Sequence, residues 1–191
     1  MQKKPITSVA IYLGARDGTT PDFMTLAHEM GAGLGAYPIT AIFGASSHGL
    51  MGAFAKSFLD AGKGTLKGYL PRYFLKGNQP EALGIPYVLT ETLAERKYKL
   101  MQDADAFLVL PGGMGTFDEV FNTLEEGLGG YIKAGRDDVF RPVFILNHDG
   151  FFDGLKIQIE KAIACGFISP RAMTCLIFEK NAADILAHFK N

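Results

Sequence analysis

The chain has 191 residues, of which 48% are hydrophobic and 20% charged, and its formal net charge is −1. The chain therefore lacks the strong positive charge that attracts proteins to nucleic acid polymers or anionic membranes. No apolar run approaches the roughly 20 residues of a membrane span, and residues 1–5 lead straight into a strand pattern rather than a signal peptide. Cys165 and Cys175 lack metal-ligand spacing, so we expect a cytoplasmic protein with no bound metal and no cofactor.

Segments typical of strands and of helices alternate along the chain. Short apolar runs predict strands at residues 8–14, 39–43, 65–70, 87–90, 106–110, 142–146 and 175–178. A first helix starts at Pro21, after Thr20, and fades in residues 31–35. Further helices are expected at residues 49–61, 93–103, 116–128, 151–165 and 182–189, with loops at 71–86 and 129–141.

This alternation predicts an α/β fold in one domain over residues 1–191, doubly wound and Rossmann-like around a mostly parallel sheet. The continuous apolar run 106–110 is typical of a strand covered on both faces. Ligands of such folds bind at the carboxyl ends of the strands. Glycine turns follow Leu13, Phe43 and Leu110, so Gly14 and Gly44 should lie at that edge.

The loop from Pro111 to Thr116 is the strongest functional signal in the sequence. A strand that stops at glycines and opens a helix leaves amide groups free beside the positive end of a helix dipole, an arrangement that binds phosphate. Gly112, Gly113 and Gly115 lack the Cβ that would keep an anion from the backbone. The spacing matches neither the dinucleotide fingerprint nor a Walker A loop. The alternative is a tight turn with no ligand.

Three further groups of residues each allow a functional and a structural interpretation. Thr116 and Glu119 have the spacing of a capping box, which on spacing alone is favoured over a catalytic role for Glu119. Ser46 either donates to a phosphate or caps the following helix. Arg96 and Lys97 belong to a charge run that is either a solvated helix face or a phosphate contact.

Taken together, residues 49–52, 95–97 and 111–119 resemble the motifs of the LOG (Lonely Guy) family. The family patterns are GGGxxGLMG, an Arg-Lys pair, and PGGxGTxxE, and the resemblance extends from the first strand to about residue 167. It implies hydrolysis of the N-glycosidic bond of nucleoside 5′-monophosphates, such as AMP and cytokinin riboside monophosphates, by a homodimer. The family's essential Arg and Glu fall on Arg96 and Glu119, and its phosphate loop falls on Gly112, Gly113, Gly115 and Thr116.

With the resemblance included, we expect Glu119 and Arg96 to be catalytic. The expected phosphate- and substrate-binding residues are Gly14, Gly44, Ser46, Lys97, Gly112, Gly113, Gly115 and Thr116. Replacement of Arg96 by alanine is expected to weaken nucleotide binding with little change in stability.

The sequence departs from the family pattern in both earlier glycine turns. Gly44-Ala45-Ser46 stands where the family has three glycines, and Arg16 and Asp17 replace hydroxyl residues in the first turn. Arg16 therefore either contacts a phosphate or pairs with Asp17. These departures leave a non-catalytic nucleotide- or molybdenum-cofactor-binding carrier as an alternative function. Lysine decarboxylation, a description often attached to such chains, would need a pyridoxal-phosphate lysine that no motif here indicates.

Overall fold

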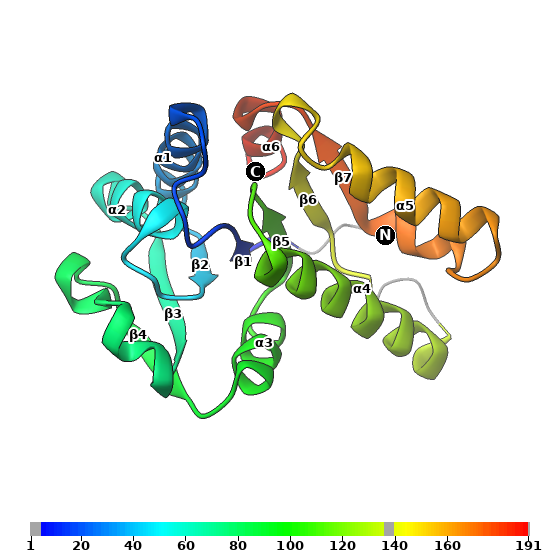
Figure 1. Ribbon diagram of the computed structural model, residues 1–191, viewed down its shortest axis with the longest axis horizontal. Helices are drawn as coiled ribbons and strands as arrows, with labels where there is room; N and C mark the ends of the chain where they lie inside the picture. Colours follow the sequence, from blue (N-terminus) through cyan, green and yellow to red (C-terminus); the bar gives the residue numbers. More distant parts are fainter. Residues whose placement is uncertain (1–4, 136–139, 191) are drawn as a thin grey trace.

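In the computed structural model, which describes residues 5–135 and 140–190, seven strands form one parallel sheet in the order β4-β3-β2-β1-β5-β6-β7 (Figure 1). The strands are β1 (Ser8–Tyr12), β2 (Thr40–Phe43), β3 (Thr65–Pro71), β4 (Tyr87–Thr90), β5 (Ala106–Val109), β6 (Val143–Leu146) and β7 (Leu176–Glu179). Every neighbouring pair is parallel. The predicted doubly wound α/β fold is therefore confirmed.

Six α-helices of the described chain lie at the predicted places. They are α1 (Pro21–Gly35), α2 (Gly49–Ala61), α3 (Leu93–Gln102), α4 (Met114–Ala134), α5 (Asp153–Ala164) and α6 (Ala182–Ala187). The stretch 71–86, predicted as a loop, contains the 3₁₀ helices η1 (Arg72–Gly77) and η2 (Pro80–Leu83); η4 (His148–Gly150) and η5 (Pro170–Cys175) are two more.

The helix predicted at 116–128 is longer at both ends, since α4 spans Met114–Ala134. The prediction ended the helix at the glycines after Leu128, each of which costs an exposed helix about 1 kcal/mol relative to alanine. A Cβ on Gly129 would meet nothing within 4 Å, whereas one on Gly127, inside the predicted helix, would lie 3.0 Å from the ring of Phe140. The predicted loop 129–141 is thus partly helical, and its residues 136–139 lie outside the described chain.

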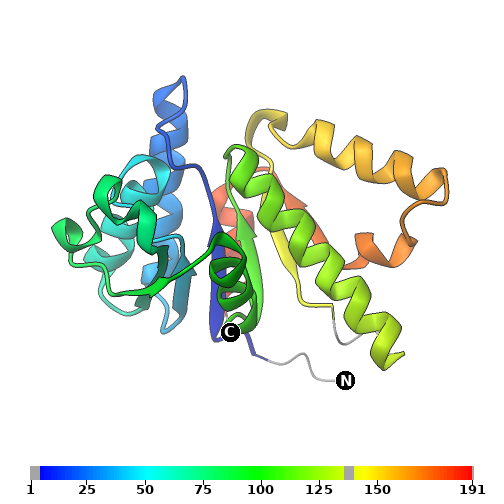
Figure 2. The same ribbon diagram turned by 60° about the horizontal axis from the view of Figure 1, so that its bottom comes forward.

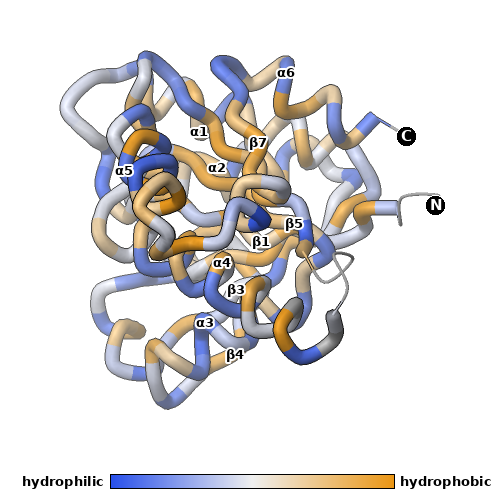
Figure 3. Tube along the Cα trace, turned by 90° about the vertical axis from the view of Figure 1, so that its right-hand side faces the viewer, coloured by the Kyte–Doolittle hydropathy of each residue, from blue (hydrophilic) through white to orange (hydrophobic). Residues whose placement is uncertain are grey.

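Alternate residues of the strands contribute to two hydrophobic cores, one on each face of the sheet. In β1, Val9 and Ile11 face the core formed with α1, α2 and α6, whereas Ala10 and Tyr12 face the core formed with α3, α4 and α5. Burial of both faces explains why the strands are apolar almost throughout. The hydropathy colouring of Figure 3 shows the central strands β1 and β5 running through the apolar middle of the molecule.

The strand order reverses between β1 and β5, which are neighbours in the sheet although α1 to α3 separate them in sequence. Figure 2 shows α4 leaving the carboxyl end of β5 close to the segment that follows β1. In doubly wound folds this reversal opens a crevice outside the carboxyl ends of the two strands, where ligands bind. The predicted edge for the glycine turns is confirmed, because β2, β1 and β5 are adjacent and parallel.

Within the described residues, no helix combines the length and the apolar character that crossing a bilayer would require. The same part of the chain contains no cluster of three or more His, Cys, Asp or Glu side chains arranged to hold a metal ion.

Candidate active site

A cleft of about 730 Å³ lies where β1 and β5 end. It is contributed by the segments that follow these strands and by the first turns of the neighbouring helices. Its lining residues are Leu13, Gly14, Ala15, Arg16, Gly18, Phe23, Leu50, Met51, Phe74, Leu93, Arg96, Lys97, Pro111, Gly112, Gly113, Met114, Gly115, Thr116, Asp118, Glu119 and Phe151. The predicted residues Gly14, Arg96, Lys97, Glu119 and those of the glycine loop thus share one cavity.

The glycine loop forms the floor of this cleft and is held against the turn after β1. The N–H of Gly14 donates to the carbonyl of Pro111 at 3.1 Å. A Cβ on Gly112 would lie 2.1 Å from Oγ1 of Thr116 and 2.9 Å from the nitrogen of Gly14, so only glycine fits there. A Cβ on Gly113 or Gly115 would meet nothing within 4 Å. These two glycines therefore leave open space over the amino end of α4, as a phosphate-binding loop requires.

The capping box predicted from Thr116 and Glu119 is not formed. The helix begins at Met114, and the N–H of Phe117 already donates to the carbonyl of Gly113 at 3.1 Å. Thr116 is a buried residue of the first turn. The Glu119 side chain bonds to Arg96 instead of to a backbone amide. The Glu119 carboxylate is therefore not used to cap the helix and is available at the cleft.

Arg96 of α3 and Glu119 of α4 form an ion pair at the cleft wall. Only 12% of the Arg96 side chain and 6% of the Glu119 side chain are exposed, so the interpretation of Arg96 as a solvated surface charge is wrong. Burial raises the pKa of the Glu119 carboxyl above its ordinary value, and the charge and hydrogen bond of Arg96 act against this rise. A positively charged partner that is buried beside a carboxylate favours the ionised form of that carboxylate.

The Arg96 guanidinium has a buried donor that is not used by the ion pair. Its Nε is buried and has no hydrogen-bond partner among the described residues. Unpaired buried donors are rare in folded proteins, and each calls for an explanation such as an ordered water or a catalytic role. Next to Arg96, Lys97 pairs with Asp118 of α4 at 2.9 Å, so two ion pairs link α3 to α4 beside the glycine loop.

The second glycine turn lies beside the cleft rather than in its lining. Ser46 is buried, and its hydroxyl accepts a hydrogen bond from the N–H of His48 at 3.1 Å, which supports the amino end of α2. A Cβ on Gly44 would lie 3.4 Å from Nη1 of Arg96, so Gly44 gives this guanidinium room. Ala45 has a left-handed φ of 57° and is fully buried. The methyl group of Ala45 therefore takes no space from the cleft.

Sequence reasoning did not identify the apolar wall of the cleft. Phe23 of α1, Phe74 of η1 and Phe151 after η4 lie far apart in sequence and line the cavity together with Met51. Phe23 and Phe151 contact each other edge to face, with ring centroids 5.9 Å apart. The only available signal was their position shortly after predicted strand ends, where ligand-contacting residues of this fold occur.

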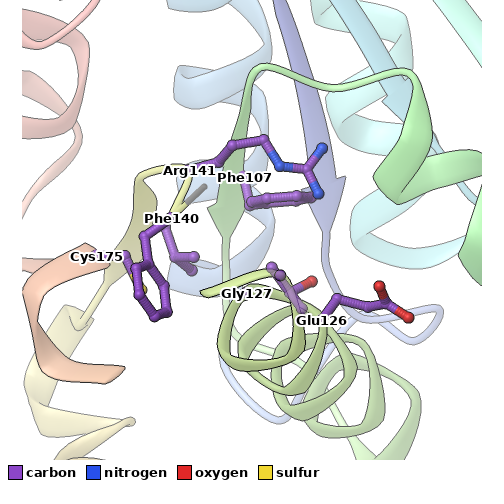
Figure 4. Close-up of a pocket in the computed structure, with 9 residues that line it drawn as sticks. Phe107, Glu126, Gly127, Phe140, Arg141 and Cys175 are labelled. Atoms are coloured by element: carbon purple, nitrogen blue, oxygen red, sulfur yellow. The ribbon is translucent and has the colours of Figure 1, made fainter. Parts of the chain in front are cut away.

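A second, smaller cavity of about 80 Å³ lies further along α4, where Thr123, Glu126, Gly127 and Gly130 line it (Figure 4). Arg141 stacks over the ring of Phe107 with 4.6 Å between guanidinium carbon and ring centroid, and its Nη1 donates to the carbonyls of Met101 and Ala104. This space holds a few waters at most, so the larger cleft is the candidate active site.

Comparison with known sequences shows which proteins this chain is similar to. A family model described as "Possible lysine decarboxylase" matches residues 51–189. A cytokinin riboside 5′-monophosphate phosphoribohydrolase of Mycobacterium tuberculosis is 32% identical over 179 residues, which covers 94% of this chain and 91% of that protein. A probable enzyme of the same name from rice, Oryza sativa subsp. japonica, is 31% identical and covers 95% of this chain and 76% of that protein.

Comparison with solved structures confirms the fold. A molybdenum cofactor carrier protein from Chlamydomonas reinhardtii superposes with a TM-score of 0.66 at 17% identity, covering 98% of this chain and 97% of that one. The molybdenum cofactor binding protein of Rippkaea orientalis gives a TM-score of 0.65 at 19% identity, covering 100% and 98%. At this level of identity the likeness concerns the fold alone.

Proposed function

This chain belongs to the LOG family, and from that premise we propose that it hydrolyses the N-glycosidic bond of nucleoside 5′-monophosphates to a free base and ribose 5-phosphate. AMP and cytokinin riboside monophosphates are the proposed substrates. One observation carries the proposal: the buried carboxylate of Glu119 and the open amino end of α4 face the same cleft. Catalysis by these groups requires no cofactor.

The glycine loop is the proposed site of the 5′-phosphate. The first amides of a helix have no acceptor within it, and the helix dipole favours an anion at this end. Gly113 and Gly115 present no side chain to keep the phosphate away. At 1.5 Å per residue, Glu119 lies about 6 Å further along the axis of α4 than Gly115, a span that a ribose ring can bridge. A phosphate on the loop therefore brings the sugar to the carboxylate.

Glu119 is the proposed catalytic carboxylate. Cleavage of an N-glycosidic bond develops positive charge on the ribose, as in other glycoside hydrolyses. An ionised carboxylate beside C1′ stabilises this charge and orients the attacking water. The water oxygen bonds to C1′, the bond between C1′ and the base nitrogen breaks with its electron pair going to the base, and the water proton ends on the base.

Arg96 has two proposed tasks in this reaction. Its charge keeps Glu119 ionised in spite of burial. Its remaining donors bind the phosphate or the ribose and fix the distance between C1′ and the carboxylate. Correct positioning of reacting groups contributes up to about 7–11 kcal/mol of barrier reduction in the best cases. The base would lie against the apolar wall formed by Phe23, Phe151 and Met51.

We further propose a cytoplasmic homodimer that acts on small nucleotides rather than on nucleic acid polymers or membranes. The near-zero net charge fits this choice of partner. The free thiols of Cys165 and Cys175 fit a reducing compartment. Phe121 and Ile132 leave 45% and 82% of their surface exposed on α4, which fits a surface that a second subunit covers.

Incubation with AMP tests the proposal directly. Purified protein should release adenine, detected by chromatography, and Glu119→Ala should release it at least about a hundredfold more slowly. Equal rates for both proteins would refute the role of Glu119. If AMP raises the melting temperature but no adenine appears, the chain is a nucleotide-binding protein without this activity.

A further inference from the structure

The charges that line the cleft are paired with one exception. Glu119 pairs with Arg96, and Asp118 pairs with Lys97 at 2.9 Å. Arg16 also lines the cleft, but no ion pair joins it to any residue of the described chain, including its neighbour Asp17. The lining therefore carries one positive charge in excess, and that charge belongs to Arg16.

The turn that carries Arg16 is held from two sides. The N–H of Gly14 donates to the carbonyl of Pro111 in the glycine loop at 3.1 Å, and the N–H of Met51 in α2 donates to the carbonyl of Gly14 at 3.3 Å. A Cβ on Gly49 would lie 2.4 Å from the carbonyl carbon of Ala15, which shows how closely α2 approaches this turn. The backbone at Arg16 is thus fixed beside the amino ends of α2 and α4.

We infer that Arg16 is a second anchor for the substrate phosphate, opposite the amides of the glycine loop, and that it makes the chain select phosphorylated nucleosides. This inference rests on the proposed function and adds to it the residue that reads the phosphate group. A guanidinium presents parallel donors that match two phosphate oxygens, and it stays charged at all relevant pH values. The amino end of a helix carries only about half a positive charge, so the full charge of Arg16 at the cleft adds to the attraction of a phosphate dianion.

Of the two roles that the sequence allows for Arg16, the lack of an ion pair with Asp17 in the described chain favours the phosphate contact. Pairing with Asp17 would have neutralised Arg16 and removed it from the site. The open space over Gly113 and Gly115 and the unpaired guanidinium border the same cavity, which is the geometric basis for a shared anion. The family pattern has hydroxyl residues in this turn, so the contribution of a full charge is particular to this chain.

Calorimetry with ribose 5-phosphate as probe tests Arg16 without requiring turnover. The variant Arg16→Gln should raise the dissociation constant by about tenfold or more, because a charge-assisted bidentate contact is lost. Arg16→Lys, which keeps the charge but not the fork, should lie between Arg16→Gln and the wild type. The control is Lys56→Gln, which makes the same change in net charge on the exposed face of α2, where Lys56 pairs with Asp60 at 2.8 Å. This control should leave the dissociation constant within twofold of the wild type.

Kinetics with AMP and competition by adenosine complete the test. Arg16→Gln should raise KM for AMP by about the same factor with kcat within about twofold, and it should not change inhibition by adenosine, which has no phosphate. An unchanged dissociation constant and KM would overturn the inference while leaving the proposed hydrolysis intact. If AMP and ribose 5-phosphate bind in an Arg16-dependent way but no adenine forms, the inference stands and the proposed reaction fails. If neither compound binds the wild type, both are refuted.

Discussion

Arg96 and Glu119 face each other across the packing of α3 and α4 as an ion pair with 12% and 6% of their side chains exposed. Twenty-three residues separate them in sequence. Burial of two charges costs free energy that their attraction offsets only when the geometry is good. Such a pair adds little to stability as a whole, yet each partner depends strongly on the other. This dependence, together with the position at the cleft wall, favours a catalytic purpose over a structural one.

The first prediction concerns stability. Arg96→Ala leaves the Glu119 carboxylate buried without its partner, so the free energy of unfolding should fall by about 3 kcal/mol or more. Arg96→Ala combined with Glu119→Ala should cost clearly less than the sum of the two single variants. Chemical denaturation of the four proteins measures this coupling. Because Arg96 is nearly buried, we expect its loss to lower stability clearly, whereas the sequence alone predicts little change.

The exposed pair of Arg72 with Glu91 is the matched control for this cycle. Its atoms are 3.1 Å apart, but 63% and 71% of the two side chains are exposed. Its coupling energy should stay below about 1 kcal/mol, as for surface ion pairs in general. Equal coupling energies for the two pairs would show that burial does not distinguish Arg96 and Glu119.

The second prediction concerns pH. Glu119 must be ionised to act, and burial raises the pKa of its carboxyl above 4.5. The value of kcat/KM for AMP should therefore fall as pH is lowered through this raised pKa, so the acid limb should lie above pH 4.5. Arg96→Gln removes the charge that opposes the rise, and its acid limb should lie at higher pH than in the wild type. An acid limb at or below pH 4.5 would contradict the assignment.

The same raised pKa has a consequence for stability. The folded protein holds the Glu119 proton more tightly than the unfolded chain does. The resulting stabilisation is complete below pH 4.5, the ordinary value, and is lost as pH rises through the folded-state pKa. Comparison with Glu119→Gln should show it: the free energy of unfolding of the wild type should fall relative to the variant over that interval. A pH-independent difference would mean that Glu119 has an ordinary pKa.

The third prediction separates two glycines of the same loop. A Cβ at position 112 would lie 2.1 Å from Oγ1 of Thr116, so Gly112→Ala should destabilise the fold by about 2 kcal/mol or more. A Cβ at position 113 would meet nothing, so Gly113→Ala should melt close to the wild type. That methyl group would instead occupy the space proposed for the phosphate, and KM for AMP should rise about tenfold or more.

Melting curves and AMP kinetics of both variants decide this prediction. Gly115→Ala is a useful third variant, since its Cβ is equally free and alanine favours the helix. Wild-type kinetics in a stable Gly113→Ala protein would argue that the phosphate does not lie on this loop.

Sequence patterns predicted the fold well because each strand carries its own signal. Runs such as 106–110 are apolar on both faces, and the glycine turn that follows them marks the carboxyl edge of the sheet. The resemblance to a family assigns both Arg96 and Glu119 to the site, but neither it nor a local pattern predicts their ion pair. The pairing of two helices is a tertiary contact, which spacing within one segment does not report.

The capping box failed for a related reason. The spacing from Thr116 to Glu119 fits a capping box, but only if the helix starts after Thr116. The sequence pattern predicts a helix from Thr116 and leaves Gly113 and Gly115 in the loop, whereas Gly115 is the second residue of α4. Because the helix starts two residues earlier than predicted, the Glu119 side chain does not cap it and is free to face the cleft. No local pattern indicates the apolar wall with Phe23 and Phe151, because the five strands β2 to β6 and the three α-helices α2 to α4 of the described chain lie between these two residues.

The last prediction concerns two consecutive buried hydrogen bonds, which run from Tyr12 through Thr123 to the backbone carbonyl of Glu119. The Thr123 hydroxyl donates to the Glu119 carbonyl at 2.9 Å, so its oxygen must accept from the Tyr12 hydroxyl, which is also 2.9 Å away. Burial raises the pKa of the Tyr12 phenol far above its ordinary value, which keeps this donor protonated. These two hydrogen bonds link the second turn of α4 to β1.

Replacing Tyr12 and replacing Thr123 should lower the free energy of unfolding by different amounts. Tyr12→Phe keeps the stacking on Phe107 and leaves only an acceptor unused, so it should cost about 1 kcal/mol of unfolding free energy. Thr123→Val leaves a buried phenol without an acceptor and should cost more, about 1–3 kcal/mol, whereas the double variant should recover part of that loss. Urea denaturation followed by circular dichroism measures the three values. A larger cost for Tyr12→Phe than for Thr123→Val would mean that the proton runs in the opposite direction, from Thr123 to Tyr12.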